Sequence, residues 1–390
     1  MAGIYLHVPF CDSRCIYCGF CSTVSRSLRQ KYIPALKREI SARRDFFSPL
    51  YESERTIKTL YIGGGTPSAL PPEILQEAVS AIREAFAFPE NAFRTNNPDE
   101  FEFTVEVNPD DISEEYAQSL RKIGVNRVSM GVQSFKDEHL RWMRRRHDSQ
   151  TALNAYNILR QAGIENINLD LIFGFPLMTL KDWEYNLDRI TELNPEHISA
   201  YQLGLDPDTP LERMEKRGEF SLPTQEESER MYKTLQAKLK AAGYIQYEVS
   251  NFCKPHCHSR HNSSYWKRVP YLGLGPGAHS FIGLAREWNT SDIASWCSAA
   301  TLNLRGGENL SPQDIFNEIL MLGLRTSEGV ALSTLRNSSP QSPAFIAEFL
   351  PNLHSLEAKG LLTLDKTGTI KIPSEKFFIS DGIIRELFVC

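Results

Sequence analysis

Near its N-terminus the chain reads Ile4-Tyr5-Leu6-His7-Val8-Pro9-Phe10-Cys11-Asp12-Ser13-Arg14-Cys15-Ile16-Tyr17-Cys18. The apolar and β-branched residues at the start of this stretch predict a strand, Ile4–Val8, and three cysteines follow with the spacing Cys-x3-Cys-x2-Cys. In barrels of parallel strands, functional groups gather at the carboxyl ends of the strands. The stretch therefore predicts both the first strand of such a fold and the place of its site.

Short β-branched runs and helical periods alternate through the first 205 residues. The predicted strands are Ile4–Val8, Ile57–Ile62, Phe101–Val107, Arg127–Val132, Ile167–Phe173 and His197–Leu203. Amphipathic helices are predicted between them, near Tyr32–Arg44, Ile74–Ala85, Glu114–Ile123, Thr151–Ala162 and Leu180–Leu193. Six strand–helix units in series indicate a parallel sheet with helices outside. Because a closed TIM barrel has eight units, we expect an α/β fold with a partial (β/α)6 TIM-type barrel.

The pattern changes twice after residue 205. A helix near Gln225–Ala242 leads into a loop-rich stretch, Tyr247–Ser280, which we interpret as an extension of the barrel. Beyond residue 300, helices near Pro312–Arg325 and Pro343–Lys359 precede a predicted β-hairpin, as in a winged-helix-like α+β domain. We therefore expect a barrel over 1–205, its extension over 206–300 and a C-terminal domain over 301–390.

Composition narrows the function classes. The formal net charge of −5 argues against broad nucleic-acid binding, which needs a basic surface. No apolar stretch approaches the roughly 20 residues of a membrane span, and the N-terminus lacks the basic start of a signal peptide. We therefore expect a cytoplasmic protein without stable membrane insertion, in which clustered cysteines are metal ligands or catalytic groups rather than disulfides.

The cysteine motif suits an iron–sulfur cluster. A cluster held entirely by protein uses four thiolates, so Cys11, Cys15 and Cys18 would leave one iron of a [4Fe–4S] cluster open. The usual occupant of such an iron is S-adenosylmethionine (SAM), which chelates it through amino and carboxylate groups. Zinc is the alternative, but zinc sites favour four ligands in two close pairs, and the next pair, Cys253 and Cys257, is distant in the sequence.

Other notable groups follow the predicted strands. Gly63–Pro67 follows the second strand, Glu106 ends the third, Gln133 follows the fourth and Asp170 lies in the fifth. A glycine triplet alone is usually a turn, and a lone carboxylate is usually on the surface. Their joint placement on the rim that also carries the cysteines indicates a common site.

With these motifs the chain resembles the radical SAM family of oxygen-independent coproporphyrinogen III oxidases and, within it, the subgroup of HemW heme chaperones. The resemblance spans essentially the whole chain. Its most specific parts are Tyr5–Cys18, Gly63–Pro67, Gly131–Phe135, Asp170–Pro176, His261–Trp266 and Gly273–His279.

The resemblance implies a role for each matching residue. Cys11, Cys15 and Cys18 would ligate the cluster. The positions that would contact SAM are Tyr5, Tyr17, Gly64, Gly65, Thr66, Glu106, Gln133, Arg145 and Asp170. Two departures stand out: Gly19 replaces the aspartate that often follows the third cysteine, and Cys21 is one position later than the fourth cysteine of the oxidases. No ligand role is therefore assigned to Cys21.

A second constellation lies between Cys253 and His261. It holds Cys253, His256, Cys257, His258 and His261, five potential metal ligands in nine residues, and the first four have no assigned role. The resemblance connects His261, Tyr265 and Trp266 with heme binding: His261 would be an axial ligand and the two aromatic rings would pack on the macrocycle. His279 is a second candidate ligand.

Three functions remain open at this point. The first is a heme chaperone with the partners heme, an acceptor hemoprotein and an electron donor for the cluster. The second is an oxygen-independent coproporphyrinogen III oxidase, and the third is a radical SAM enzyme that breaks heme down. The ten residues ahead of Cys11 and the spacing of Cys21 favour the chaperone. Fold alone does not decide whether the chain is an enzyme.

Overall fold

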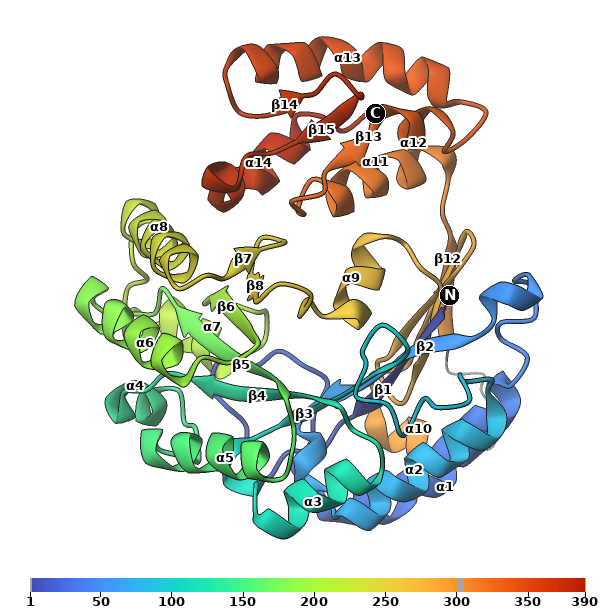
Figure 1. The fold of residues 1–390 in the computed structure, drawn as a ribbon, viewed down its shortest axis with the longest axis vertical. Coiled ribbons are helices and arrows are strands. Elements are labelled where there is room, and N and C mark those ends of the chain that lie inside the picture. Colours follow the sequence, from blue (N-terminus) through green and yellow to red (C-terminus); the bar gives the residue numbers. More distant parts are fainter. Residues whose placement is uncertain (1, 300–304, 390) are drawn as a thin grey trace.

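The computed structural model describes residues 2–299 and 305–389 (Figure 1). Its centre is a run of parallel strands in sequence order, β1 (Ala2–Val8), β2 (Ile57–Gly64), β3 (Glu102–Val107), β4 (Arg127–Gln133), β5 (Asn166–Phe173) and β6 (His197–Gln202). All six predicted strands are confirmed. Each ends at the rim that carries the predicted site residues.

Helices cover the outer face of these strands (Figure 1). They are α1 (Arg26–Arg43), α2 (Pro72–Ala85), α3 (Glu114–Lys122), α4 (Asp137–Trp142), α5 (Ser149–Gln161) and α6 (Leu180–Leu193). Helix α2 shows why they form: Pro72 suits the first turn, and Leu75, Ala78, Val79 and Ile82 make one buried face. The five predicted helices of this region are confirmed, and α4 was not predicted.

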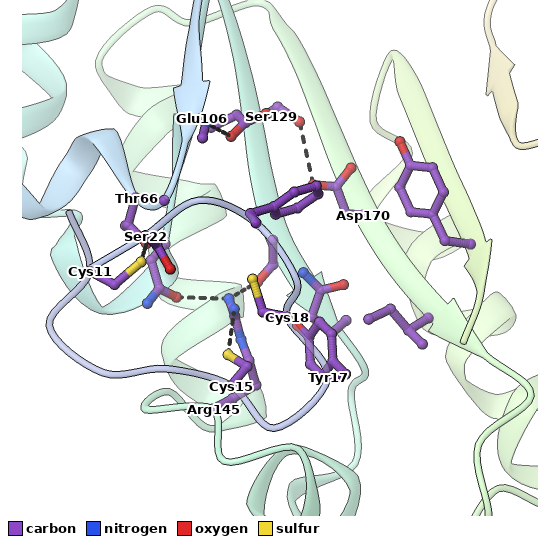
Figure 2. Close-up of a pocket in the computed structure, with 18 of the residues that line it drawn as sticks. Cys11, Cys15, Tyr17, Cys18, Ser22, Thr66, Glu106, Ser129, Arg145 and Asp170 are labelled. Atoms are coloured by element: carbon purple, nitrogen blue, oxygen red, sulfur yellow. Dashed lines mark hydrogen bonds between the residues drawn. The ribbon is translucent and has the colours of Figure 1, made fainter. Parts of the chain in front are cut away.

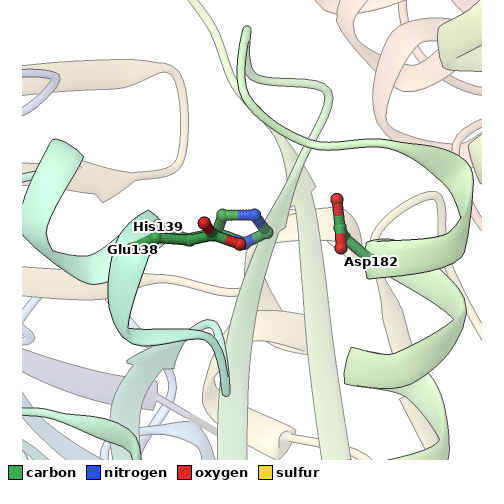
Figure 3. Close-up of side chains that lie close together, drawn as sticks. All are labelled: Glu138, His139 and Asp182. Atoms are coloured by element: carbon green, nitrogen blue, oxygen red, sulfur yellow. The ribbon is translucent and has the colours of Figure 1, made fainter.

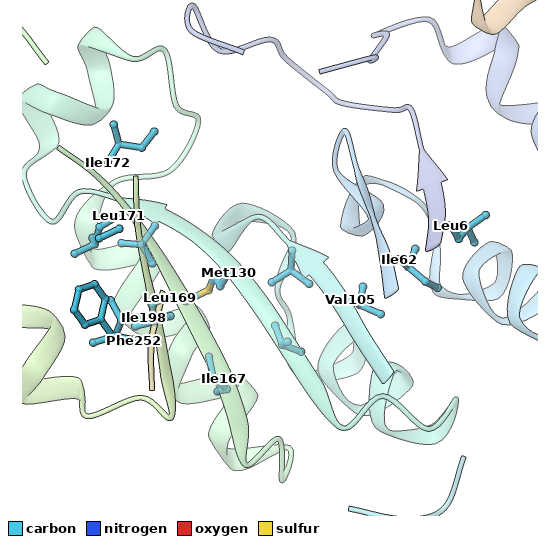
Figure 4. Packing of buried hydrophobic residues seen from close by; sticks show 14 of the residues in the cluster. Leu6, Ile62, Val105, Met130, Ile167, Leu169, Leu171, Ile172, Ile198 and Phe252 are labelled. Atoms are coloured by element: carbon cyan, nitrogen blue, oxygen red, sulfur yellow. The ribbon is translucent and has the colours of Figure 1, made fainter. Parts of the chain in front are cut away.

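The strands alternate between an apolar outer row and a polar inner row. Leu6, Ile62, Val105, Val128 and Ile167 are register neighbours from β1 to β5 and are fully buried in the apolar core (Figure 4). The neighbouring row on the opposite face, one residue along each strand, is polar. This alternation follows from the period of two along a strand, and it leaves the inside of the curved sheet lined with polar side chains.

The sheet is larger than six strands. On one side β9 (Tyr271–Leu274) pairs in parallel with β1, and β10 (His279–Ile282), β11 (Ala285–Asn289) and β12 (Arg305–Asn309) continue it in antiparallel order. On the other side β8 (Asn251–Cys253) and β7 (Ile245–Gln246) follow β6. Within the described residues β12 and β7 remain edges, so the sheet does not close into a barrel.

The prediction that Tyr247–Ser280 consists largely of loops is wrong. Tyr247–Ser280 contains β8, β9, the start of β10 and the helix α9 (Arg260–Trp266). The expected motif loop at His261 is therefore a helix, and its N-cap is the side chain of Ser259, which accepts from the backbone N–H of Asn262. Outside this segment, the other helices between β6 and residue 299 are α7 (Pro210–Lys216), α8 (Gln225–Ala241) and α10 (Ile293–Ser298). Of these, α8 was predicted.

The last 80 residues form a small α+β unit. Helices α11 (Pro312–Gly323), α12 (Leu332–Arg336), α13 (Ser342–Ala358) and α14 (Ser380–Arg385) accompany a three-stranded antiparallel sheet of order β13-β15-β14, with strands Val330–Ala331, Thr369–Lys371 and Thr363–Leu364. The two predicted helices and the hairpin are confirmed. Short 3-10 turns occur at Glu52–Glu54, Pro67–Ala69, Pro109–Asp111 and Ser374–Ile379. No helix in the described part of the chain is long and apolar enough to cross a membrane.

Candidate functional site

A cavity of about 550 Å³ opens at the carboxyl ends of the parallel strands (Figure 2). Its wall includes all three cysteines of the motif. From the predicted SAM positions it includes Tyr17, Gly64, Gly65, Thr66, Glu106, Gln133, Arg145 and Asp170. Tyr5 does not line it: its hydroxyl lies 3.0 Å from His7 Nδ1, within the sheet. The structure thus brings together eleven predicted residues from six separate stretches of sequence.

The cysteine loop is fixed from several sides. The N–H of Ile16 donates to the carbonyl of Met143, and the carbonyl of Ile16 accepts from the N–H of Leu211 at 2.9 Å. At the start of the loop, Asp12 forms ion pairs with Arg29 at 2.7 Å and with Arg146 at 3.3 Å. These contacts join the loop to α1, to the segment after α4 and to α7. The loop is therefore positioned by the fold before any metal binds.

Two side chains donate to cysteine sulfur atoms. Thr66 Oγ1 donates to Cys11 Sγ at 3.5 Å, and Arg145 Nη1 donates to Cys15 Sγ at 3.5 Å (Figure 2). Burial raises the pKa of the Cys11 and Cys18 thiols. Thiolates in this wall need compensating charge, and a hydroxyl, a guanidinium and a bound metal ion are groups that supply it. The donor set is that of a soft-metal or iron–sulfur site.

The glycines of Gly63–Pro67 let β2 pack against the cysteine loop. The N–H groups of Gly65 and Thr66 donate to the carbonyls of Val8 and Phe10, each at 2.8 Å. A Cβ on Gly65 would lie 2.8 Å from the Phe10 carbonyl oxygen and 3.0 Å from Cys11 Sγ. Gly64 has φ +117°, which only glycine adopts without strain. The loop therefore shapes the cavity by holding Cys11 close to Thr66.

Glu106 projects into the cavity from β3. Its Oε1 accepts from the Tyr61 hydroxyl at 2.8 Å, and its Oε2 accepts from the N–H of Gly64 at 3.0 Å. Burial raises the pKa of Glu106 to about 7, although both of these hydrogen bonds favour the charged form. Near neutral pH this carboxyl group can therefore be either a hydrogen-bond donor or an anion.

Asp170 faces the same space from β5. Asn168 Nδ2 donates to its Oδ1 at 2.7 Å, and Ser129 Oγ lies 3.4 Å from its Oδ2. Burial raises the pKa of Asp170. Two carboxyl groups thus line one wall, each anchored by neighbours and each open to a ligand that carries hydroxyl or ammonium groups.

Arg145 already has three acceptors. Besides Cys15 Sγ, its Nη2 donates to Asn108 Oδ1 at 3.0 Å and to the Gly131 carbonyl at 2.7 Å. Its neighbour Gln133 has φ 67°, a left-handed backbone that is uncommon for residues other than glycine. The hydrogen bond from Arg145 to Gly131 and the left-handed backbone of Gln133 both lie at the end of β4. This strand end therefore forms part of the cavity wall and does not continue into a regular turn.

Cys21 lies outside the cavity. Its Sγ lies 3.3 Å from the carbonyl oxygen of Ser291, and its own carbonyl oxygen lies 2.7 Å from His7 Nε2. The side chain therefore faces the segment after β11. That Cys21 is not a ligand stays a prediction, and its sulfur lies apart from the three cysteines that line the cavity.

The proposed heme residues lie on α9. His261 is only 1% exposed, with Nδ1 2.8 Å from Thr59 Oγ1 and Nε2 2.8 Å from the Tyr265 hydroxyl. Coordination of heme iron by His261 would thus need one of these bonds to break. Trp266 is half-buried at the end of α9, and His279 is exposed on β10 with its ring stacked on Trp288. None of these residues lines the cavity, whereas Asn262 of the same helix does.

The remaining residues of the second constellation do not converge. Cys253 is buried on β8, and His256 has φ 66° in the turn that follows. Within the described residues, Glu138, His139 and Asp182 are the only group of three or more histidine, cysteine or carboxylate side chains whose ligand atoms all lie within 4.8 Å of one another, the spacing for a single metal ion (Figure 3). Lys136 Nζ forms ion pairs with both carboxylates of that group, so an ammonium already balances them.

Several cavity residues were not predicted. They are Tyr61, Arg127, Ser129, Asn168, Ser199, Tyr201 and Asn262. Part of their signal in the sequence is the period of two: Asn168 lies two residues before Asp170 on β5, and Ser129 is the register neighbour of Asn168 on β4. Applied from Asp170, the period finds Asn168 and the register then adds Ser129, but the period along β5 does not find the other five, which lie on other elements.

Comparison with known proteins agrees with this geometry. Residues 5–190 match the model of the Radical SAM superfamily, and residues 310–369 match that of the HemN C-terminal domain. The solved structure of coproporphyrinogen III oxidase (HemN) from Escherichia coli, described as a radical SAM enzyme, superimposes with a TM-score of 0.81 at 25% identity, covering 100% of this chain and 90% of that one. The fold is thus that of a radical SAM protein.

Relatives narrow the class further. The heme chaperone HemW of Bacillus subtilis is 34% identical over 366 residues, 93% of each chain. That of Mycobacterium tuberculosis H37Rv is 33% identical, again over 93% of each chain. A mitochondrial radical SAM domain-containing protein 1 of Danio rerio is 31% identical over 98% of this chain and 90% of its own. The chain belongs to the HemW family.

Proposed function

We propose that Cys11, Cys15 and Cys18 hold a [4Fe–4S] cluster and that SAM binds beside it in the cavity. The three side chains converge on one cavity, and Thr66 and Arg145 donate to two of their sulfur atoms. When bound, such a cluster offers one open iron to the amino and carboxylate groups of SAM and an electron to its sulfonium. The family membership and the donor set both support this assignment.

The cavity wall supplies the other groups that SAM needs. Glu106 and Asp170 present carboxyl oxygens to the amino group and to the ribose hydroxyls of SAM, and Gln133 lies at the same rim. The backbone of Gly64 and Gly65 lets the methionyl end approach closely, and Thr66 and Tyr17 complete the wall around the cysteines. Tyr5 contributes indirectly, through His7 and the packing of β1.

We propose that the protein is a heme chaperone, which binds heme and delivers it to an acceptor hemoprotein. The observation that carries this proposal is the similarity to heme chaperones over 93% of each chain. The partners are heme, the acceptor and an electron donor for the cluster. The proposed heme residues are His261, Tyr265 and Trp266, and Tyr265 must release His261 Nε2 for that nitrogen to reach iron. The cytoplasmic location stays a prediction, because the relatives include a protein named as mitochondrial.

The second candidate is oxygen-independent oxidative decarboxylation of coproporphyrinogen III. The observation that favours it is the fold-wide match to HemN, with a TM-score of 0.81. The position of Cys21 argues against it, because its sulfur faces Ser291 and not the cavity.

One pair of incubations separates the two functions. The reconstituted protein is mixed under anaerobic conditions with heme and, separately, with coproporphyrinogen III, SAM and a reductant. A chaperone gives a heme absorbance spectrum in the first and no decarboxylated porphyrin in the second. Product formation at a catalytic rate in the second incubation would instead establish the oxidase. Transfer of bound heme to an apo-hemoprotein then tests delivery.

A further inference from the structure

Arg127 is a buried cation whose guanidinium has no hydrogen-bond partner in the described residues. It begins β4, its side chain lines the cavity, and it is only 1% exposed. Its Nε is buried with no hydrogen-bond partner, and its guanidinium makes no hydrogen bond or ion pair within residues 2–299 and 305–389, although its charge acts on the buried carboxyl groups of Glu106 and Asp170. Burying a charged group without hydrogen-bond partners costs free energy. Such a side chain therefore indicates that a bound ligand supplies the missing acceptors.

The other arginines near the core show the contrast. Arg43 is the other buried arginine among the described residues, and it donates to Glu287 Oε2 at 2.6 Å and to Ser280 Oγ. Arg145 donates to three acceptors. The Nε atoms of Arg43 and Arg145 also lack a partner, so what distinguishes Arg127, which lines the cavity, from both is that none of its three side-chain nitrogens makes a hydrogen bond in the described part of the chain.

Arg127 lies at the opposite end of β4 from the cysteine loop. Gln133 ends the strand at the rim, and six residues at about 3.3 Å each place their backbones roughly 20 Å apart. Arg127 is in register with Thr104 on β3 and, through it, with Tyr61 on β2. The next row on the same face, two residues nearer the carboxyl ends of the strands, holds Glu106, Ser129 and Asn168. SAM has a single carboxylate, and the proposed function places it at the open iron. An acid that meets Arg127 therefore belongs to a second molecule.

The rest of the wall indicates what that molecule is like. Phe20 and Tyr201 line the same cavity with 68% and 42% of their surfaces exposed, and Ile172 and Leu203 add apolar surface. Glu106 and Asp170 also face the cavity, and their charges disfavour a dianion such as phosphate more than a singly charged carboxylate. The wall suits a ligand with a large apolar body and a carboxylate arm.

We propose that Arg127 binds a carboxylate of a second ligand at the deep end of the cavity; resting on the proposed function, that carboxylate is a propionate of heme. A guanidinium presents two parallel N–H groups to a carboxylate, which suits a fixed position in a narrow wall. Arg127 then selects porphyrins with free propionates, and its guanidinium gains hydrogen-bond acceptors when such a ligand is bound.

Esterification of the propionates tests this directly. The cluster-loaded protein is titrated with heme and with heme dimethyl ester, which has the same macrocycle without the acids. We expect wild type to bind heme at least tenfold more tightly than the diester. Arg127→Gln should abolish this preference, and Arg127→Lys should restore only part of it because a lysine lacks the paired donors. Arg160→Gln, at an arginine outside the cavity wall that pairs with Glu196, serves as the matched control and should keep the full preference.

Each other outcome overturns a distinct statement. Equal binding of heme and diester by wild type, or an unchanged preference in Arg127→Gln, removes the propionate assignment and leaves the chaperone function standing. A parallel loss of SAM affinity in Arg127→Gln, measured on the same samples, would assign the arginine to SAM. Failure of wild type to bind heme at all refutes the proposed function together with the propionate assignment. Iron content and the thermal unfolding midpoint show whether each variant has folded.

Discussion

The ring of His261 stacks on the ring of Tyr61, with centroids 5.1 Å apart and planes inclined by 28°. Tyr61 in turn donates its hydroxyl to Glu106 in the cavity wall. The helix that carries the proposed heme residues is thus in direct contact with the residue that holds a proposed SAM carboxylate. A rearrangement of α9 that frees His261 would change the surroundings of Glu106, so the two ligands are expected to influence each other.

The first prediction concerns the cluster. Anaerobic reconstitution should give about four irons and four sulfides per chain, the composition of one cubane. Replacing Cys11, Cys15 or Cys18 with alanine should abolish it, since each removes one of three thiolates. Cys21→Ala is the matched control, because that sulfur contacts Ser291 outside the cavity. Iron and sulfide analysis with the absorbance spectrum measures the result, and loss of the cluster in Cys21→Ala would disprove the three-ligand assignment.

The second prediction concerns the affinity for SAM. Glu106→Gln and Asp170→Asn should each weaken binding by about 1.5–3 kcal/mol, the usual contribution of a hydrogen bond to a charged group. Isothermal titration of the cluster-loaded protein measures this. Asp188→Asn, at a carboxylate on α6 that pairs with Lys238, is the control and should bind SAM like wild type. Unchanged affinity in both cavity variants would mean that these carboxylates only support the fold.

The third prediction concerns pH. Because the pKa of Glu106 is raised to about 7, its anion is abundant at pH 8 and scarce at pH 6. SAM should therefore bind more weakly as the pH falls through 7. The amine of SAM also titrates near this range, so the informative quantity is the difference between wild type and Glu106→Gln, in which the contribution of the carboxylate is absent.

Tyr61→Phe refines the pH test. The hydrogen bond from Tyr61 lowers the pKa of Glu106, so its removal should raise that pKa further and move the midpoint of the SAM profile to higher pH. The phenyl ring keeps the stack on His261. A midpoint that stays in place, or moves to lower pH, would show that Glu106 does not control the profile.

The fourth prediction concerns heme. His261→Ala should shift the Soret band and weaken heme binding if His261 is the axial ligand, whereas Cys11→Ala should leave heme binding largely intact. A combined replacement of Cys253, His256, Cys257 and His258 tests whether a neighbouring thiolate or imidazole takes over, since a thiolate ligand gives a distinct spectrum. If the spectrum is unchanged in His261→Ala and in the combined variant, the heme ligand is elsewhere.

The sequence predicts the parallel strands well because each is a compact β-branched run next to an amphipathic helix. It does not predict β9, which has four residues, one of them a glycine, and whose parallel partner β1 lies more than 260 residues away in the sequence. Helix α9 was missed for a related reason. Its seven residues carry no helical period, and it is stabilised by Glu102, whose carboxylate accepts from the N–H groups of Arg260 and His261.

The candidate site divides in the same way. Cysteines, glycines and carboxylates at strand ends could be found because their chemistry is rare in those positions. Arg127 could not be found in this way, because a cation at the first residue of a strand is normally exposed to solvent. Its burial, at 1% exposed, is a property of the assembled fold.

The position of β1 inside the sheet has a consequence for the synthesis of the protein. One edge of β1 pairs with β2, but the other stays open until residues 271–274 have left the ribosome. The contacts at the end of the cysteine loop form later still, because Cys21 lies against Gly277 and Ser291, which are translated after β9. The cysteines are therefore among the first residues made, and their surroundings are among the last completed. Metal insertion into a finished site can thus only follow the translation of about three quarters of the chain, because Ser291 is part of the surroundings of the loop.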